Sequence, residues 1–267
     1  MSADAMRSLH TRYGPWAVVA GASSGLGAAY ATRLAEAGFA LALVARRAPE
    51  LEALAATLAG RYGVETRALP LDLGQTDAAA ILDARTSDLD VGLLVYNAAR
   101  APVGAFLDLA LEEHLAELAV NTRTPMELAW RFGRRFRARG RGGLLLMSSL
   151  GANQGTALAA NYGATKAWAL TLTAGLLEEW RELGLDALAV QPAVIAGAGA
   201  RAGGATLAPD AVARAGLAAL GRGPSVTPGA TVKLASFFMR RVMPRKSAIR
   251  MMGRVMRRMY GGGAQRE

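Results

Sequence analysis

Tyr162 and Lys166 stand four residues apart, so on a helix their side chains would share one face, about one turn apart. Lys166 is one of three lysines among 31 basic residues, the others being Lys233 and Lys246. An ammonium beside a phenol favours the phenolate, and we expect it to lower the pKa of Tyr162 toward neutrality. The pair could then act as a general acid and base, although a helix surface with no role could carry the same spacing.

A glycine-rich loop follows the first expected strand. Its residues are Gly21, Ala22, Ser23, Ser24, Gly25, Leu26 and Gly27. Glycine permits a tight turn and lets backbone N–H groups approach a pyrophosphate at the start of the next helix. Such a loop can also be a plain turn, and its position after an N-terminal strand is what favours a dinucleotide site.

The end of the second expected strand indicates which dinucleotide would bind. Its last residues and the two that follow are Val44, Ala45, Arg46 and Arg47. A site selective for NAD(H) would place an acid here to hold the ribose 2′-hydroxyl, and none is present. Two guanidinium groups suit a 2′-phosphate, so we expect NADP(H), although ordinary solvated arginines are common in so arginine-rich a chain.

Strand-like apolar runs alternate with helical patterns along the chain, which is typical of a parallel sheet with crossover helices. The expected strands are Trp16–Ala20, Ala40–Ala45, Glu65–Pro70, Val91–Tyr96, Gly143–Met147, Asp186–Val190 and a short Ser225–Thr227. The expected helices are Ala28–Ala37, Glu50–Tyr62, Asp77–Asp88, Leu111–Ala138, Tyr162–Leu183 and Pro209–Leu220. We therefore predict an α/β fold: a single-domain, doubly wound parallel β-sheet of the Rossmann type, with helices on both faces, over residues 13–229.

The composition excludes several classes of site. Cysteine is absent, and His10 and His114 are the only histidines, so we expect no metal, no disulfide and no Ser-His-Asp catalysis. Both histidines lie in polar or Glu-rich stretches, and we expect them on solvated faces. The first twelve residues are polar and include Asp4, and no apolar run reaches the roughly 18 residues that span a bilayer. We expect a cytoplasmic protein without a signal peptide.

The net charge of +10 belongs to the end of the chain. Residues 231–267 hold ten basic residues and one acid, which is +9, and the preceding 230 residues hold 21 basic and 20 acidic residues, which is +1. Pro244 divides residues 230–260 into two helical pieces. We predict a basic helical C-terminal extension over residues 230–267 that packs on the same domain and closes one side of the substrate pocket.

The second helical piece of this extension is amphipathic. Apolar and basic residues recur on opposite sides: Ile249, Met252, Met256 and Met259 against Arg250, Arg254, Arg257 and Arg258. Such a helix can lie on anionic lipid, but packing on the domain or on a second subunit, with the arginines in water, is favoured. Nucleic acid is not expected as a partner, because beyond Tyr260 the segment lacks interleaved aromatic residues.

Taken together, the glycine loop, the Tyr162/Lys166 pair and the order of strands make the chain similar to the short-chain dehydrogenase/reductase family. Ser149 lies thirteen residues before Tyr162, the usual family spacing, and Asn121 falls in the long fourth helix, where the family places an asparagine that kinks the helix. By this resemblance Asn121, Ser149, Tyr162 and Lys166 are the catalytic residues. The resemblance also implies cofactor contacts outside the glycine loop, at Arg46, Arg47, Asp72, Leu73, Asn97, Ala98, Ala99, Tyr162, Lys166, Pro192, Ala193 and Ile195.

Some positions depart from the family pattern. The family usually has threonine where this chain has Ala20, and asparagine where it has Tyr96. It usually has glycine where this chain has Ala99 and Ala193. The threonine expected shortly after Pro192, which would hold the nicotinamide carboxamide, is not evident. None of these changes removes a group that performs chemistry.

The resemblance implies an NADP(H)-dependent oxidoreductase that interconverts a ketone and a secondary alcohol, with Tyr162 as general acid and base. The segment 192–208 is predicted to be a loop rich in glycine and alanine. Such a loop does not indicate which polar headgroup a substrate would carry, and it suggests an apolar substrate. A homodimer or homotetramer is expected. Two alternatives stay open: a catalytically silent NADP(H)-binding sensor and a membrane-surface module.

Overall fold

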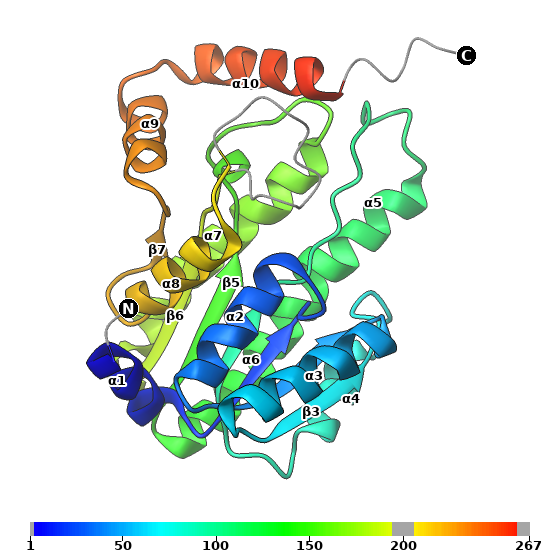
Figure 1. Cartoon of the computed structure of the whole chain (residues 1–267). Coiled ribbons are helices and arrows are strands. Elements are labelled where there is room, and N and C mark those ends of the chain that lie inside the picture. The colour runs from blue at the N-terminus through cyan, green and yellow to red at the C-terminus, as the bar shows by residue number, and fades with distance from the viewer. Residues whose placement is uncertain (1–2, 194–205, 261–267) are drawn as a thin grey trace.

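A single sheet of seven strands lies at the centre of the molecule (Figure 1). The computed structural model describes residues 3–193 and 206–260. The strands are β1 (Trp16–Ala20), β2 (Ala40–Ala45), β3 (Thr66–Pro70), β4 (Val91–Tyr96), β5 (Gly142–Met147), β6 (Leu185–Val190) and β7 (Ser225–Val226). Neighbouring strands pair in parallel in the order β3-β2-β1-β4-β5-β6-β7. The chain therefore winds outward from β1 in both directions, and the predicted doubly wound Rossmann-type sheet is confirmed.

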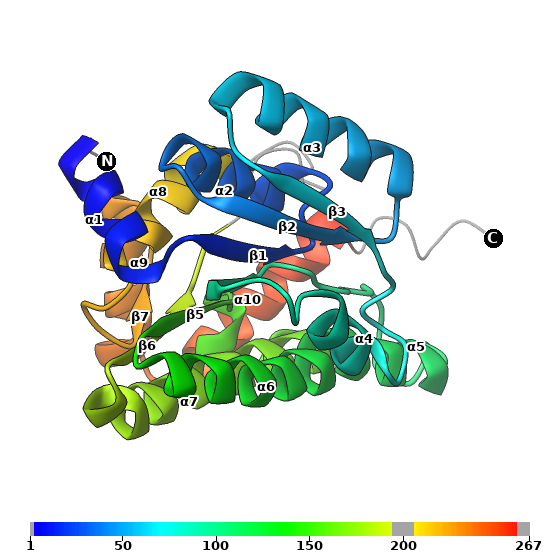
Figure 2. The same cartoon turned by 90° about the horizontal axis from the view of Figure 1, so that it is seen from below.

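Helices cover both faces of the sheet (Figure 2). One face carries α2 (Gly25–Glu36), α3 (Ala48–Tyr62) and α8 (Pro209–Ala219), and the other carries α4 (Ala78–Arg85), α6 (Thr124–Arg139) and α7 (Ala160–Trp180). Alternate side chains of β1 serve the two cores: Ala17 and Val19 pack on the first side, and Val18 and Ala20 on the second. Because both faces are buried, the strand sequences are continuous apolar runs.

The first residues form an element that the sequence did not indicate. Helix α1 (Ala3–Tyr13) precedes the sheet, and its Leu9 and Tyr13 are buried. The Tyr13 hydroxyl donates to Asp186 at 2.6 Å, and Arg12 pairs with the same carboxylate, also at 2.6 Å. Burial, followed by the contact with Asp186, raises the pKa of Tyr13. The polar composition of this segment did not indicate a helix. The contact that anchors it, between Tyr13 and Asp186, spans 173 residues of sequence.

The long helix predicted over Leu111–Ala138 is interrupted. The structure has α5 (Leu111–Leu118), a π-helical turn at Ala119–Arg123 and then α6. Pro125 lies just after this turn and has no N–H to donate to the carbonyl of Asn121, which would be its α-helical partner. The interruption therefore falls at Asn121 for a reason that the sequence contains.

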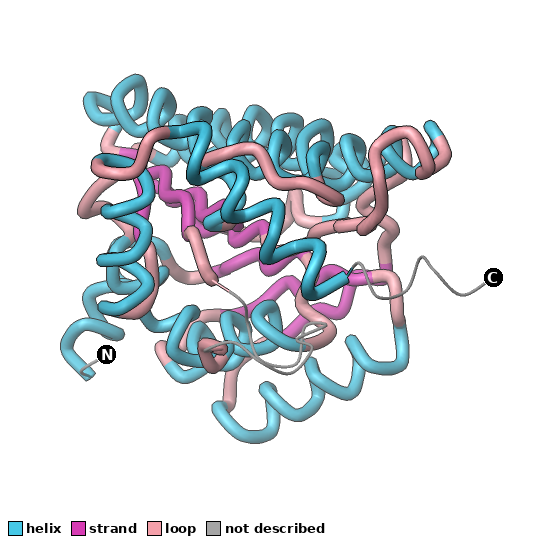
Figure 3. Tube along the Cα trace, turned by 90° about the horizontal axis from the view of Figure 1, so that it is seen from above, coloured by secondary structure: helices cyan, strands magenta, loops and turns pink. Residues whose placement is uncertain are grey.

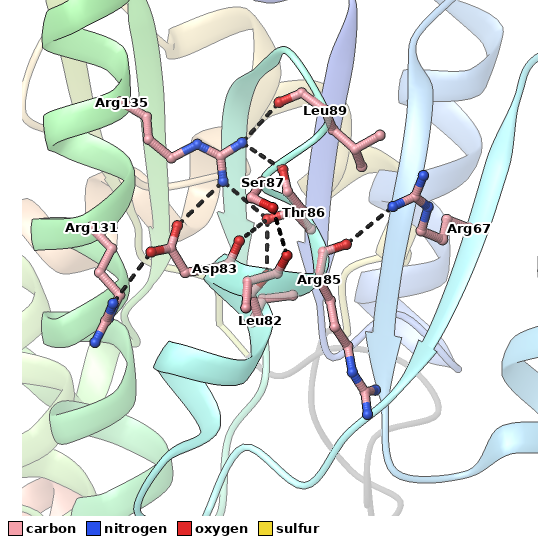
Figure 4. Close-up of polar contacts among 10 residues, drawn as sticks. Arg67, Leu82, Asp83, Arg85, Thr86, Ser87, Leu89, Arg131 and Arg135 are labelled. Carbon is pink, nitrogen blue, oxygen red and sulfur yellow. Dashed lines mark hydrogen bonds and ion pairs between the residues drawn. The ribbon is translucent and has the colours of Figure 1, made fainter.

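Arginines of α6 fasten the end of α4 to the sheet (Figure 4). Arg131 and Arg135 pair with Asp83 at 3.2 and 3.4 Å. The Arg135 guanidinium also donates to the carbonyl oxygens of Thr86 and Leu89 at 2.7 and 2.8 Å. These contacts cap a turn at the amino-terminal side of β4, far from the carboxyl ends of the strands, and they hold the scaffold in place.

Two helices follow the sheet, α9 (Ala230–Arg241) and α10 (Arg245–Tyr260), with Pro244 between them. In Figure 1, α9 stands at the upper left and α10 crosses the top of the molecule. The predicted division of the last segment into two helical pieces agrees with these elements. No helix within residues 3–193 and 206–260 is long and apolar enough to cross a membrane.

Candidate active site

A cleft of about 910 Å³ opens at the carboxyl ends of the strands. Its position beside β1 and β4 is the switch point of the sheet, where the chain direction reverses and doubly wound proteins bind ligands. Most of the residues predicted to contact a cofactor line it: Gly21, Ser23, Ser24, Gly25, Leu26, Arg46, Arg47, Asp72, Leu73, Asn97, Ala98, Ala99, Tyr162, Lys166 and Pro192. The fold thus gathers in one cavity residues that are widely separated in sequence.

The glycine loop is held closely against the β4 end. Gly21 has φ +81°, and a Cβ there would lie 2.6 Å from the backbone nitrogen of Ala98. At Gly27, which does not line the cleft, a Cβ would lie 1.9 Å from the carbonyl oxygen of Gly21. Asn97 donates from Nδ2 to that same oxygen at 3.0 Å. These two glycines are therefore required by packing, which fixes the loop at the start of α2.

Gly25 faces open space, in contrast to Gly21 and Gly27. It has φ +57°, and a Cβ there would meet nothing within 4 Å. Gly25 is the first residue of α2, so backbone N–H groups of the first helical turn are free of intrahelical partners and face the cleft. This cradle fits the pyrophosphate of a dinucleotide.

Cations line the cleft beside β2. Arg47 donates to Ser23 Oγ and Ser24 Oγ at 3.3 and 3.4 Å and pairs with Glu50 at 2.9 Å, so it bridges the glycine loop and α3. Arg46 is exposed and also lines the cleft. The end of β2 therefore offers two guanidinium groups where a free 2′-hydroxyl would call for an acid, an arrangement that fits a 2′-phosphate.

Asp72 and Leu73 follow β3 at the same edge of the sheet. The Asp72 carboxylate accepts from the Gly74 N–H at 2.9 Å, which holds its loop. Leu73 is buried, and its carbonyl accepts from Thr124 Oγ1 at 2.7 Å. Both residues line the cleft.

Tyr162 and Lys166 lie one turn apart on α7 and line the same cleft. The Lys166 Nζ is 5.5 Å from the centre of the Tyr162 ring and donates to the Met147 carbonyl at 2.9 Å. Burial lowers the pKa of Lys166 to about 8. Tyr162 and Lys166 therefore share one face of α7, as predicted, and the buried Lys166 ammonium has the Met147 carbonyl as its partner.

The pKa of Tyr162 differs from the sequence-based expectation. It is raised, chiefly because the hydroxyl is buried; Glu117 and Tyr260 raise it further, and a hydrogen bond with Ser149 lowers it. Lys166 is not among the causes of the shift, and its ammonium donates to the Met147 carbonyl. The prediction that Lys166 brings the phenol toward neutrality is wrong for this arrangement of the side chains.

Asn121 occupies the π-helical turn and is buried. Its side chain accepts from the Arg100 N–H at 2.9 Å and donates to the Arg100 carbonyl at 2.8 Å. It also donates to Thr165 Oγ1 at 3.1 Å, and Thr165 in turn donates to the Tyr162 carbonyl at 2.8 Å. Asn121 therefore joins the loop after β4 to α7, and does not itself line the cleft.

Sequence reasoning missed Glu117, which lies one turn before Asn121. Its side chain is 1% exposed, Oε2 accepts from Asn161 Nδ2 at 2.7 Å, and Oε1 is buried with no hydrogen-bond partner. Burial raises the pKa of this carboxyl. Glu117–Asn161 and Asn121–Thr165 form two rungs: the first joins α5 to α7, and the second joins the π-helical turn to α7, four residues further along each segment. No local sequence pattern indicated the rung at Glu117, because it joins elements far apart in the chain.

His114 also departs from expectation, because it is buried and not solvated. It is 8% exposed, its ring stacks on Phe106 with centroids 4.4 Å apart, and Nε2 lies 3.0 Å from the Phe106 carbonyl. Leu111, Glu112 and Leu115 around it are exposed, but His114 faces the loop before α5. This histidine has a structural partner.

Tyr96 explains one departure from the family pattern. Its hydroxyl donates to the Val120 carbonyl at 2.6 Å, inside the π-helical turn. Burial raises the pKa of Tyr96, so the phenol stays protonated and keeps donating. A tyrosine here thus satisfies a carbonyl that the π-helical turn leaves without its usual α-helical partner.

The segment after β6 is only partly described. Pro192 lines the cleft, and its carbonyl accepts from the Leu150 N–H at 3.3 Å. Ala193 does not line the cleft. Ile195 and the positions where a nicotinamide-binding threonine was sought lie outside the described residues.

The C-terminal helices reach the loops around Ser149. Asn153 donates to Ser236 Oγ on α9 at 3.4 Å, and a Cβ at Gly253 of α10 would lie 3.5 Å from the Cβ of Ala157. Tyr260, the last residue of α10, acts electrostatically on Tyr162. Figure 3 shows α10 crossing the molecule above the strands. The inner side of α10 therefore packs against the segment between Ser149 and Tyr162.

Comparison with known proteins identifies the family. A family model described as short chain dehydrogenase matches residues 15–205. The chain belongs to the short-chain dehydrogenase family. It is 34% identical over 177 residues to a 7beta-hydroxysteroid dehydrogenase of Clostridium sardiniense, covering 66% of this chain and 68% of that protein.

Solved structures agree with this assignment. One, of a 7beta-hydroxysteroid dehydrogenase, superposes with a TM-score of 0.87 at 28% identity, covering 91% of this chain and 98% of that chain. Another, a short-chain dehydrogenase from Sphingobium yanoikuyae in complex with NADPH, has a TM-score of 0.76 at 32% identity, covering 83% and 90%. The chain is therefore an oxidoreductase that acts between a hydroxyl and a carbonyl group.

Proposed function

We propose that the protein reduces a bulky apolar ketone, or oxidises the corresponding secondary alcohol, with NADP(H) as cofactor and Tyr162 as general acid and base. One observation carries the proposal: the glycine loop, the paired arginines and the Tyr162 side chain line a single cleft. The volume of that cleft, about 910 Å³, lies within the range of small-molecule sites.

NADP(H) fits the residues that are present. The N-terminus of α2 would hold the pyrophosphate, Arg46 and Arg47 the 2′-phosphate, and Asp72 the adenine end. Asn97 would stand at the nicotinamide end with Tyr162 and Lys166. When bound, the cofactor supplies or accepts the hydride.

The chain's own residues would move the proton. Ser149 would donate a hydrogen bond to the substrate carbonyl oxygen, and Tyr162 would give its proton to that oxygen as negative charge develops there. The raised pKa of Tyr162 keeps the phenol protonated at neutral pH, which suits reduction. Lys166 would hold the ribose hydroxyls, and Asn121 would keep α5 and α7 in register through Thr165.

The substrate class is supported by the relatives. A matched protein acts on a hydroxysteroid, as its name states. Phe106, Leu107 and Val103 are exposed on the loop that precedes α5. A ring system of steroid size is the first class to test.

Several sequence predictions remain proposals. Residues 13–229 would form the catalytic body and residues 230–267 an extension on it. Self-association is supported by exposed apolar side chains on α5 and α6, namely Leu111, Leu115, Met126 and Trp130, beside an apolar surface on α7. A cytoplasmic location also stays a prediction.

A substrate panel tests the proposal. Purified protein is mixed with steroid ketones, simple ketones and 3-oxoacyl thioesters, and the loss of reduced-nicotinamide fluorescence is followed with NADPH and NADH separately. Turnover of a steroid-sized ketone with NADPH supports the proposal. NADPH binding without turnover of any ketone or alcohol would instead support the silent sensor.

A further inference from the structure

The last two helices carry most of the net charge of the protein. Between Ala230 and Tyr260 the sequence contains nine cations and no acid. The cations are Lys233, Arg240, Arg241, Arg245, Lys246, Arg250, Arg254, Arg257 and Arg258. A charge of this density without countercharges needs either water or an anionic partner.

Helix α9 turns apolar side chains away from the body. Leu234, Phe237 and Phe238 are 70%, 59% and 50% exposed, and Val242 just after the helix is also exposed. The opposite side of the helix carries the buried Ser236, which contacts Asn153. The packed side of α9 is therefore polar at this point and the outward side is apolar, the reverse of an ordinary surface helix.

Helix α10 divides its two sides differently. Ala248 and Gly253 are buried and Met252 and Met256 are half-buried, which partly agrees with the apolar stripe predicted from the sequence. Ile249, another member of that stripe, is exposed, and the Met259 side chain lies outside the described residues. Its basic residues are exposed. α10 packs on the body near Ala157 with one side and presents arginines with the other.

A loop from the body reaches the same end of the molecule. Residues 97–110 rise toward the top of Figure 1, where α10 lies. On this loop Leu107 is 92% exposed and Phe106 is 55% exposed. Exposed apolar side chains and arginines thus belong to segments at the same end of the molecule.

We propose that this end of the protein docks on an anionic phospholipid surface, with α9 and the Phe106–Leu107 loop in the interfacial region and the arginines of α10 against the headgroups. Apolar side chains beside unopposed cations are the pattern of a helix lying in a membrane interface. Each cation near such a surface adds to the attraction. The inner side of α10 stays on the body near Ala157, so the packing predicted from the sequence and the lipid contact would use different sides of the same helix pair.

Charge argues against the other occupants. Two copies meeting through this surface would bring two sets of nine cations together without acids between them, which is repulsive. Nucleic acid would match the charge but would leave Leu234, Phe237 and Phe238 without an apolar partner. A bilayer interface satisfies both features.

Co-sedimentation with vesicles tests the proposal independently of catalysis. Full-length protein is mixed with vesicles of phosphatidylglycerol and phosphatidylcholine in equal parts, or of phosphatidylcholine alone. We expect binding to the anionic vesicles that weakens as salt rises, because screening shortens the reach of surface charge. Arg250→Gln with Arg254→Gln should weaken binding at least about tenfold. Phe237→Ser with Phe238→Ser should also weaken it, with less dependence on salt.

A charge-matched control lies on the body. Arg134 and Arg137 are exposed on α6, and Arg134→Gln with Arg137→Gln removes the same charge without touching this surface. The control should bind vesicles like the parent, and NADPH binding should be unchanged in all variants, which shows that they fold. Equal loss in the control and the α10 variant, or equal binding to neutral vesicles, would overturn the proposal. So would binding of duplex DNA, or self-association through α9, with no vesicle binding.

Discussion

The body of the protein and the C-terminal helix pair differ in their charge balance and in the exposure of their large apolar side chains. In the body, charges are nearly balanced and the residues that form the cleft are held by close backbone contacts, such as Gly27 against the Gly21 carbonyl. In the helix pair, cations stand without acids and large apolar side chains such as Phe237 are exposed. The residues that form the cleft have their packing partners within the chain, whereas the outward face of the helix pair is suited to a partner outside it.

Replacing a glycine by alanine should change the free energy of unfolding very differently in the two regions. Gly27→Ala places a Cβ 1.9 Å from the Gly21 carbonyl oxygen, where neither backbone segment can yield easily. We expect a loss of about 3 kcal/mol or more in the free energy of unfolding, measured with urea, and weaker NADPH binding.

Gly253→Ala is the matched change in the helix pair. Its Cβ would lie 3.5 Å from the Ala157 Cβ, an ordinary contact, and alanine is favoured over glycine inside a helix by about 1 kcal/mol. This variant should be neutral or more stable. Similar losses at Gly27 and Gly253 would remove the contrast between the two regions.

The buried ammonium of Lys166 should make stability depend on pH. Its folded pKa of about 8 lies below its unfolded value of about 10.4, so between these values the unfolded chain binds more protons and stability rises with pH. Comparing the parent with Lys166→Met isolates this contribution, on the order of 3 kcal/mol. The parent-minus-variant difference in unfolding free energy should increase from pH 8 to about pH 10.4. A flat difference would show that Lys166 is not held as a buried base.

Removing the Arg46 guanidinium should change the preference for NADPH over NADH. NADPH should bind the parent at least about tenfold more tightly than NADH, which corresponds to one charge-assisted contact of about 1.4 kcal/mol. Arg46→Ala should narrow this ratio, as measured by reduced-nicotinamide fluorescence. Arg61→Ala, a change near the end of α3 that does not line the cleft, should leave this ratio unaltered. Equal affinities of the parent for both cofactors would reject the assignment.

Truncating an exposed aromatic side chain of α9 should have the smallest effect on the free energy of unfolding. Phe237→Ala should change the free energy of unfolding by less than about 0.5 kcal/mol, because the ring is exposed. Phe132, fully buried on α6, is the reference, and Phe132→Ala should cost about 3–5 kcal/mol. A large loss at Phe237 would mean that the body already covers this side chain in solution.

The sequence predicted the sheet because each buried strand is a continuous apolar run with turn residues on both sides. β1, β2 and β4 begin and end at the predicted residues. The helix α1 was missed because its anchor, Asp186, lies in a distant strand. The interruption at Asn121 was expected only by resemblance, although Pro125 provides its physical cause.

The cleft was predicted better than the surroundings of its catalytic groups. Glycines, arginines and the Tyr162/Lys166 spacing are local signals, and the fold brings these residues together. The direction of the Lys166 ammonium toward Met147, and the rung between Glu117 and Asn161, depend on how α5, α7 and β5 pack. Such contacts join elements far apart in sequence, so no local pattern contains them.

The central claim is that Tyr162 transfers the proton in a cleft that binds NADP(H), and Tyr162→Phe tests it most directly. The variant keeps the ring and removes the hydroxyl, so NADPH fluorescence titration should give an affinity close to that of the parent. Turnover of a ketone that the parent reduces should fall by about 10²–10⁴-fold, the usual contribution of a general acid. Turnover near the parental rate, with NADPH bound normally, would contradict the account.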